Sequence, residues 1–129
     1  METKRINSAK DLRVYKNAYA LAMEIFNISK IWPREEKYSL TDQIRRSSRS
    51  VCTNLREAWA KRRYEAHFIS KLTDSDGENS ETDTWVDFAK DCGYISVVDH
   101  SRLKKECKEV GGMLGSMLVN PAPFLIKDR

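Results

Sequence analysis

The residues best suited to chemistry in this sequence form none of the arrangements on which familiar catalytic and metal sites depend. The chain contains two histidines, His67 and His100, and three cysteines, Cys52, Cys92 and Cys107. No cysteines form a Cys-x-x-Cys pair, and no histidine completes the Glu-x-x-His spacing of di-iron helical bundles. The P-loop, the glycine-rich dinucleotide motif and the nucleophile elbow of hydrolases are also absent. The sequence therefore predicts no enzyme activity, no metal and no cofactor, with an enzyme of unrecognised type left as an alternative.

A run of acidic residues from Asp74 to Asp83 superficially suggests a cation-binding loop. Its glycine, Gly77, stands fourth in the run, whereas the twelve-residue calcium loop needs glycine at the sixth position. We therefore interpret the run as the solvated face of a helix.

The cysteines are odd in number and far apart, so we expect them to be reduced and buried in helices as small hydrophobic residues. The N-terminus has no apolar segment of the kind found in secretory signals. No apolar run approaches the ~18 residues that a membrane-spanning helix needs. These features favour a cytoplasmic protein that does not associate with membranes.

Charge is distributed unevenly along the chain, although its net value is only +4. Residues 64–92 hold eight acidic side chains against Lys71 and Lys90. Residues 43–63 hold one acidic residue, Glu57, and seven basic ones: Arg45, Arg46, Arg49, Arg56, Lys61, Arg62 and Arg63. Adjacent segments of opposite sign can pair neighbouring helices or subunits, or the basic segment can bind a polyanion. Both interpretations remain open from charge alone.

Four amphipathic helices must position these charges. Their predicted ranges are 9–31, 40–62, 64–92 and 99–119, followed by an apolar C-terminal tail over 120–129. Connections of ~4–8 residues enforce antiparallel neighbours. We therefore predict a single domain, 1–129, with an all-α, antiparallel up-down-up-down four-helix bundle.

Local signals indicate where the helices begin and end. The segments Ser8-Ala-Lys-Asp11 and Ser39-Leu-Thr-Asp42 have the spacing of capping boxes, and Asp99 or Ser101 could cap the fourth helix. The Trp32-Pro33 pair ends the first helix, because the residue before proline is disfavoured in the α conformation.

Apolar or small residues at 3-4 spacing predict the face of each helix that enters the core. On the first helix this face carries Leu12, Tyr15, Ala18, Tyr19, Ala22, Ile25, Phe26 and Ser29. On the other helices, the residues predicted to be buried include Ile44, Val51, Phe68, Leu72, Val86, Val110 and Leu114.

The third helix has a polar middle. Its inward stripe is predicted to consist of Phe68, Leu72, Ser75, Asn79, Thr82, Val86 and Ala89. The three polar residues among them could form a hydrogen-bonded layer that sets the register of the bundle. Gly77 weakens the helix by ~1 kcal/mol relative to Ala, so a break near residues 74–80 is the alternative. The helix is expected to stop at Gly93, where glycine suits the position after the last turn.

Several apolar side chains lie off the predicted core face, and one bundle of this size cannot easily bury them all. They are Trp59, Ile69, Trp85 and Phe88, together with the tail Phe124-Leu125-Ile126. Aromatic residues outside a core usually mark an interface. We therefore predict a closed cyclic homo-oligomer in which these residues form the subunit contacts.

Several segments resemble one protein family over roughly residues 10–119. They are Asp11-Leu-x-Val-Tyr15, the run Tyr38-Ser-Leu-Thr-Asp-Gln-Ile-Arg-Arg-Ser-Ser-x-Ser-Val51, Asn54, Glu81-Thr-x-Thr-Trp-x-Asp-Phe-Ala89 and Cys92-Gly-Tyr94. The family is the four-helix-bundle proteins named after open reading frames in intervening sequences of bacterial 23S ribosomal RNA genes.

This resemblance implies an antiparallel four-helix bundle that assembles into a ring-like homopentamer. It also implies kinship with the accessory variability proteins of diversity-generating retroelements, basic pentameric bundles that work with a reverse transcriptase and nucleic acid. No enzyme activity is established for the family. After Asn54 many relatives carry small residues ending in Glu-Gly, whereas this chain reads Leu55-Arg-Glu-Ala58. Arg56 thus stands where a small residue is common, which disfavours close packing at that position and adds a cation to the basic surface.

We therefore expect a non-enzymatic, homo-oligomeric protein that binds RNA or DNA, with the seven basic residues of 43–63 as phosphate contacts. A reverse transcriptase or another protein is a further expected partner. The alternative is an oligomeric protein-interaction scaffold without nucleic-acid binding. The position of the arginines distinguishes these two functions. Arginines on a continuous exposed surface could bind phosphates, whereas arginines paired with carboxylates across a subunit interface could not.

Overall fold

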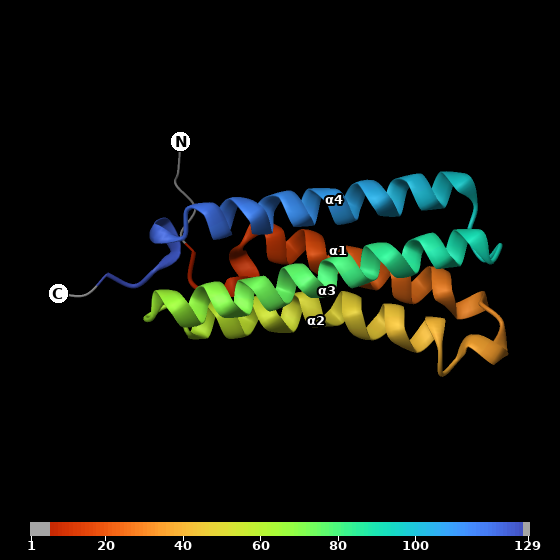
Figure 1. Cartoon of the computed structure of the whole chain (residues 1–129), viewed down its shortest axis with the longest axis horizontal. Coiled ribbons are helices and arrows are strands. Elements are labelled where there is room, and N and C mark those ends of the chain that lie inside the picture. Colours follow the sequence, from red (N-terminus) through yellow and green to blue (C-terminus); the bar gives the residue numbers. More distant parts are fainter. Residues whose placement is uncertain (1–5, 128–129) are drawn as a thin grey trace.

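Four long helices run alternately up and down the molecule in the computed structural model, which describes residues 6–127 (Figure 1). They are α1 (Arg13–Ile28), α2 (Leu40–Ala60), α3 (Glu65–Asp91) and α4 (Val97–Val119). Short 3-10 turns, η1 (Ala9–Asp11), η2 (Ser29–Ile31), η3 (Arg34–Glu36) and η4 (Ala122–Phe124), flank them, and the described residues form no strand. The predicted all-α fold with four helices is confirmed. Residues 1–5 of the predicted domain, and 128–129 of its tail, lie outside the described residues.

The predicted capping box at the N-terminus forms, but it closes a 3-10 turn rather than starting α1. The Ser8 hydroxyl oxygen accepts from the Lys10 backbone N–H (3.0 Å), and the Asp11 carboxylate accepts from the Ser8 N–H (3.1 Å). Leu12 is then extended, with ψ at 136°, so the α-helix begins only at Arg13.

The second predicted cap is wrong. Ser39 precedes α2 but makes no side-chain cap, and the Glu36 carboxylate accepts from the Leu40 N–H instead (3.3 Å). The predicted caps of the fourth helix are also wrong. The Ser96 hydroxyl oxygen accepts from the Asp99 N–H (3.0 Å), so α4 begins at Val97.

Helix α3 is continuous, and the alternative of two shorter helices is wrong. Gly77 faces open space, with nothing within 4 Å of the position that a Cβ would occupy. The helix is held in place by its inward stripe, and the seven residues predicted for that stripe are its buried residues: Phe68, Leu72, Ser75, Asn79, Thr82, Val86 and Ala89. It ends as predicted, because Gly93 adopts a φ of +81° after the last turn.

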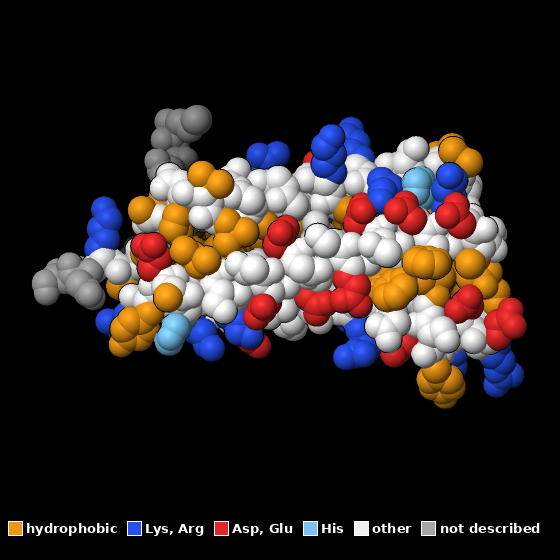
Figure 2. Space-filling model, viewed as in Figure 1, with side chains coloured by type: hydrophobic (Ala, Val, Ile, Leu, Met, Phe, Trp, Pro, Cys, Tyr) orange, Lys and Arg blue, Asp and Glu red, His pale blue; other side chains and the backbone are white. Residues whose placement is uncertain are grey.

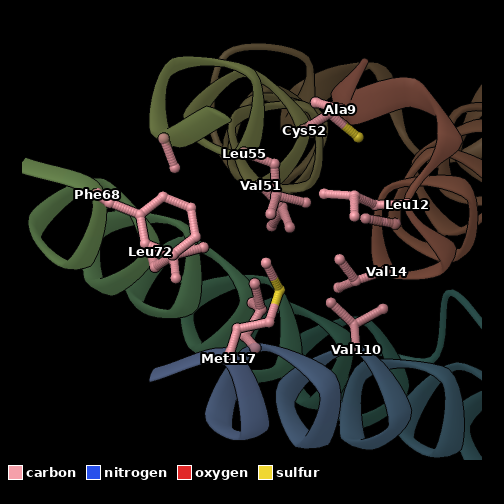
Figure 3. Close-up of a cluster of buried hydrophobic side chains, with 13 residues drawn as sticks. Ala9, Leu12, Val14, Val51, Cys52, Leu55, Phe68, Leu72, Val110 and Met117 are labelled. Atoms are coloured by element: carbon pink, nitrogen blue, oxygen red, sulfur yellow. The ribbon is translucent and has the colours of Figure 1, made fainter. Parts of the chain in front are cut away.

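The core consists of two apolar clusters, one toward each end of the bundle. Figure 3 shows the first, where Phe68 and Leu72 of α3 lie beside Val51 of α2 and Met117 of α4. The second joins Leu21, Ile25, Ile44, Val86 and Leu103, among others. Each of the seven core residues predicted on α2, α3 and α4 is buried.

A polar layer lies between the two clusters, as predicted. The Ser47 and Thr82 hydroxyl oxygens are 2.8 Å apart, and the Ser75 hydroxyl donates to the Val51 carbonyl over 2.8 Å. The Asn79 amide donates to the Cys107 carbonyl over 2.9 Å. These bonds connect α3 to both α2 and α4, so they penalise any sliding of one helix along another.

The predicted core face of the first helix is right for its aliphatic and small residues and wrong for its aromatic ones: Leu12, Ala18, Ala22, Ile25 and Ser29 are buried. Tyr19 is 54% exposed and Phe26 is half-buried, whereas Val14 and Leu21 are buried. The helix contains two series of residues with 4-3-4 spacing. One consists of residues 14, 18, 21 and 25, and the other, shifted by one residue along the sequence, consists of residues 15, 19, 22 and 26. The aliphatic series enters the core because tyrosine is better placed where its hydroxyl reaches water.

The cysteine prediction is confirmed for two residues and wrong for the third. All three are free; Cys52 and Cys107 are buried, while Cys92 is exposed at the end of α3. Burial raises the pKa of the Cys52 thiol to about 11 and that of Cys107 to about 12, so neither is a reactive thiolate near neutral pH. None of the helices in residues 6–127 is long and apolar enough to cross a membrane.

Candidate nucleic-acid interface

The predicted phosphate contacts occupy α2 and the turn that follows it. Arg46, Arg49 and Arg56 lie on α2 outside its buried stripe, and all three are exposed, with Arg49 on the edge that faces α1. Lys61 and Arg63 are exposed in the turn between α2 and α3. Five of the seven cations therefore lie on the surface, along one helix and its C-terminal turn.

Arg45 has a different environment. Its Nε donates to the Ser29 hydroxyl (2.8 Å), its Nη2 donates to the Phe26 carbonyl (3.4 Å), and its guanidinium lies 4.9 Å from the Phe26 ring centroid. A cation at the C-terminus of α1 also complements the helix dipole. Arg45 thus fastens the end of α1 to α2 and has less freedom to meet a phosphate than its neighbours.

Arg62 is also engaged within the chain. Its guanidinium lies 4.0 Å from the centroid of the Trp59 ring and donates to the Trp59 carbonyl (3.0 Å). Its own carbonyl accepts from the Ile126 N–H (3.3 Å). Arg62 therefore connects the end of α2 to the C-terminal tail.

None of the seven cations takes part in an ion pair within residues 6–127. The carboxylates that do form ion pairs there bind other cations: Glu57 pairs with Lys71 (2.7 Å), for example, and Asp83 with Lys104 (2.6 Å). Arg46 approaches Glu78 closely enough to favour the ionised carboxylate, but burial outweighs this effect and the pKa of Glu78 is raised. The charge that α2 presents to solvent is thus not neutralised inside the molecule.

Two tyrosines that the sequence placed in the core lie beside these cations. Tyr15 and Tyr19 lie one turn apart on α1, with ring centroids 6.1 Å apart and planes tilted by 31°. A hollow of about 260 Å³ between α1 and α2 is lined by Tyr15, Tyr19, Ala22, Met23, Arg49, Cys52 and Thr53. The available signal was the second 4-3-4 series on α1, which carries aromatic residues at three of its four positions.

The predicted oligomer contacts separate into two groups. Trp59 packs on the first core cluster, and Phe124 stacks on Phe68 with centroids 6.3 Å apart, so the C-terminal tail folds back onto its own bundle. Ile69 is half-buried on α3. The apolar tail therefore needs no second subunit to cover it.

Trp85 and Phe88 remain as an apolar patch on α3. Phe88 is 52% exposed, and its ring centroid is 5.7 Å from that of Trp85. Figure 2 shows hydrophobic side chains gathered over the C-terminal half of α3, next to acidic ones. A hollow of about 250 Å³ adjoins both rings and is also lined by Glu36, Ser39, Leu40, Gln43 and Cys92.

The described residues contain no group of three or more histidine, cysteine or acidic side chains that could hold a metal ion. Fold and surface together define a basic four-helix bundle whose second helix carries unpaired arginines. The chain matches the family model of the 23S rRNA-intervening sequence protein over residues 10–116, and it belongs to that family.

A solved structure of similar fold is a protein of unknown function from the S23 ribosomal protein family of Bacteroides thetaiotaomicron VPI-5482. It is 28% identical in sequence, covers 83% of this chain and 96% of its own, and superposes with a TM-score of 0.75. No curated protein matches the chain.

Proposed function

We propose that this protein is a non-enzymatic, homo-oligomeric nucleic-acid-binding protein that contacts phosphates through α2. The observation that supports this proposal is the set of five exposed, unpaired cations on α2 and its turn: Arg46, Arg49, Arg56, Lys61 and Arg63. Contacts of this kind release counterions and carry little sequence information. Reduced cysteines suit the cytoplasm, and a reverse transcriptase remains a proposed partner by family resemblance.

Oligomerisation multiplies this surface. In a closed ring, and by family resemblance a pentamer, each subunit would contribute one basic helix, so weak phosphate contacts would add through avidity. The patch of half-buried Trp85 and exposed Phe88 supports a subunit contact on α3. The same patch favours the second candidate function, an oligomeric protein-interaction scaffold, if nucleic acid does not bind.

Fluorescence anisotropy with labelled RNA and DNA, at two salt concentrations, tests the proposal. We expect wild type to bind both at low salt and to lose affinity steeply as salt rises. The variant R46Q/R49Q/R56Q should bind weakly, and its dependence of log K on log salt should be shallower by about 2 to 3.

A matched control, K90Q/K105Q/K108Q, removes three exposed cations from α3 and α4 and should bind like wild type. Absence of binding by wild type at low salt would overturn the proposal in favour of the scaffold. Equal losses in the two triple variants would show that net charge, rather than the surface of α2, determines affinity.

A further inference from the structure

The seam between α1 and α2 combines two neighbouring tyrosine rings with cations from both helices. Tyr19 is 54% exposed, and its ring is tilted against that of the half-buried Tyr15, with the centroids 6.1 Å apart. Within residues 6–127, neither tyrosine hydroxyl donates a hydrogen bond to another protein group. The Tyr19 ring is therefore available at the surface, while Tyr15 packs on the first core cluster beside it.

Cations flank the two rings on both sides. Arg49 and Thr53 of α2 line one hollow beside the rings, about 260 Å³ in volume. Lys10 and Lys16 line a second hollow of about 390 Å³, which contains the same two tyrosines. No acidic side chain lines either hollow. A ligand lying across the tyrosines would thus meet positive charge at either end.

A third aromatic residue holds Arg49 at the seam. The Arg49 guanidinium lies 5.6 Å from the Phe26 ring centroid, and the same ring carries Arg45 and Lys30, each at 4.9 Å. The tyrosine pair, Phe26 and these cations follow one another along the edge of α1 that faces α2. Alternating rings and cations in a groove are typical of surfaces that bind single-stranded nucleic acid.

We infer that the α1–α2 seam binds single-stranded nucleic acid, with a base stacked on Tyr19 and the flanking phosphates on Arg49 and Lys16. The inference rests on the proposed function and specifies its ligand. A duplex buries the faces of its bases, so it could use the cations of α2 but not the tyrosine rings. Stacking accepts any base, so the seam should show little sequence preference.

Anisotropy titrations of the full chain with a labelled 12-nucleotide single strand and a 12-base-pair duplex test the inference. The variant Y19L keeps apolar bulk but removes the ring, and it should weaken single-strand binding roughly 5- to 150-fold. It should leave duplex affinity and the salt dependence unchanged, because no cation is lost. Y19F retains the ring and should bind within about twofold of wild type.

Y38L is the matched control, since Tyr38 is 82% exposed but lies in the connection between α1 and α2, away from the seam. It should bind like wild type. Photocrosslinking of wild type to a strand containing 5-bromouracil gives a second readout that does not depend on a variant. Crosslinks should map to the peptide that contains Tyr15 and Tyr19.

The outcomes separate the two proposals. If wild type binds both ligands and Y19L is unchanged, or crosslinks map elsewhere, the tyrosine site is overturned while binding through α2 stands. If Y19L weakens duplex and single strand alike, the site is overturned as well. If wild type binds neither ligand, both proposals fail.

Discussion

Among the carboxylates of residues 6–127, Glu106 on α4 has the pKa that the fold shifts most. Burial raises its pKa to about 7, and the facing carboxylate of Glu24 on α1 acts in the same direction, as does Glu109 more weakly. Arg102 opposes these effects, but it also binds Glu24 and Asp99. One carboxylate oxygen of Glu106 is buried without a hydrogen-bond partner among the described residues.

A raised pKa means that the folded state binds this proton more tightly than the unfolded state. The stability contributed by protonated Glu106 is present below its ordinary pKa of 4.5 and is lost as the pH rises through about 7. Glu106→Gln keeps a neutral, hydrogen-bonding side chain at every pH. We expect it to match wild type at pH 5 and to exceed it in unfolding free energy at pH 8, in urea titrations.

Glu109→Gln serves as the control, because it removes the same charge from an exposed position on the same helix. Its effect should be much smaller at both pH values. A Glu106→Gln variant no more stable than wild type at pH 8 would show that the carboxylate pair is tolerated in its ionised form.

At the scale of the helices, the polar layer brings α3 and α4 together at a glycine. A Cβ at position 111 would lie 3.3 Å from the Asn79 amide nitrogen, whereas a Cβ at position 112 would meet nothing within 4 Å. Asn79 is 5% exposed and donates to the Cys107 carbonyl, so it has little freedom to move away. The two adjacent glycines thus have different roles in one helix.

Gly112→Ala should stabilise the protein by up to about 1 kcal/mol, because alanine favours the helix. Gly111→Ala gains the same propensity but displaces Asn79 from its bond to α4, a loss of about 1 kcal/mol, so we expect no stabilisation. Denaturant unfolding of both variants measures the difference. Equal stabilisation of the two would mean that Asn79 adjusts without cost.

At the scale of the whole molecule, the C-terminal tail reduces the apolar surface that demands a partner. Phe124 and Leu125 pack on the first core cluster, which leaves Trp85 and Phe88 as the main exposed aromatic pair on α3. The subunit contact in the proposed oligomer should therefore include the C-terminal half of α3.

Light scattering at micromolar concentration should give a mass several times that of the 15.0 kDa chain, and five times for a pentamer. Phe88→Glu should shift the protein toward monomer, since a charge cannot be buried unpaired in an apolar contact. Ile31→Glu changes an isoleucine that is 85% exposed at the end of the bundle and should leave the mass unaltered. A monomeric wild type would contradict the oligomer.

Much of the fold follows from local order in the sequence. The stripe from Phe68 to Ala89 has a 4-3 spacing with no competing series, so one face of α3 is determined before any neighbour is considered. The same holds for the buried stripe of α4, from Leu103 to Met117. Gly93 ends α3 because few other residues adopt a positive φ.

Other features were decided only by tertiary structure, because they depend on neighbours far away in sequence. On α1 two periodic series compete, and the shape of the core selects Leu21 over Tyr19. Charge patterning cannot distinguish Arg45, which binds Ser29 and Phe26, from Arg46, which is exposed one position later. The rotation of each helix about its own axis is set by packing against the other three, and that rotation places the tyrosines and arginines in one seam.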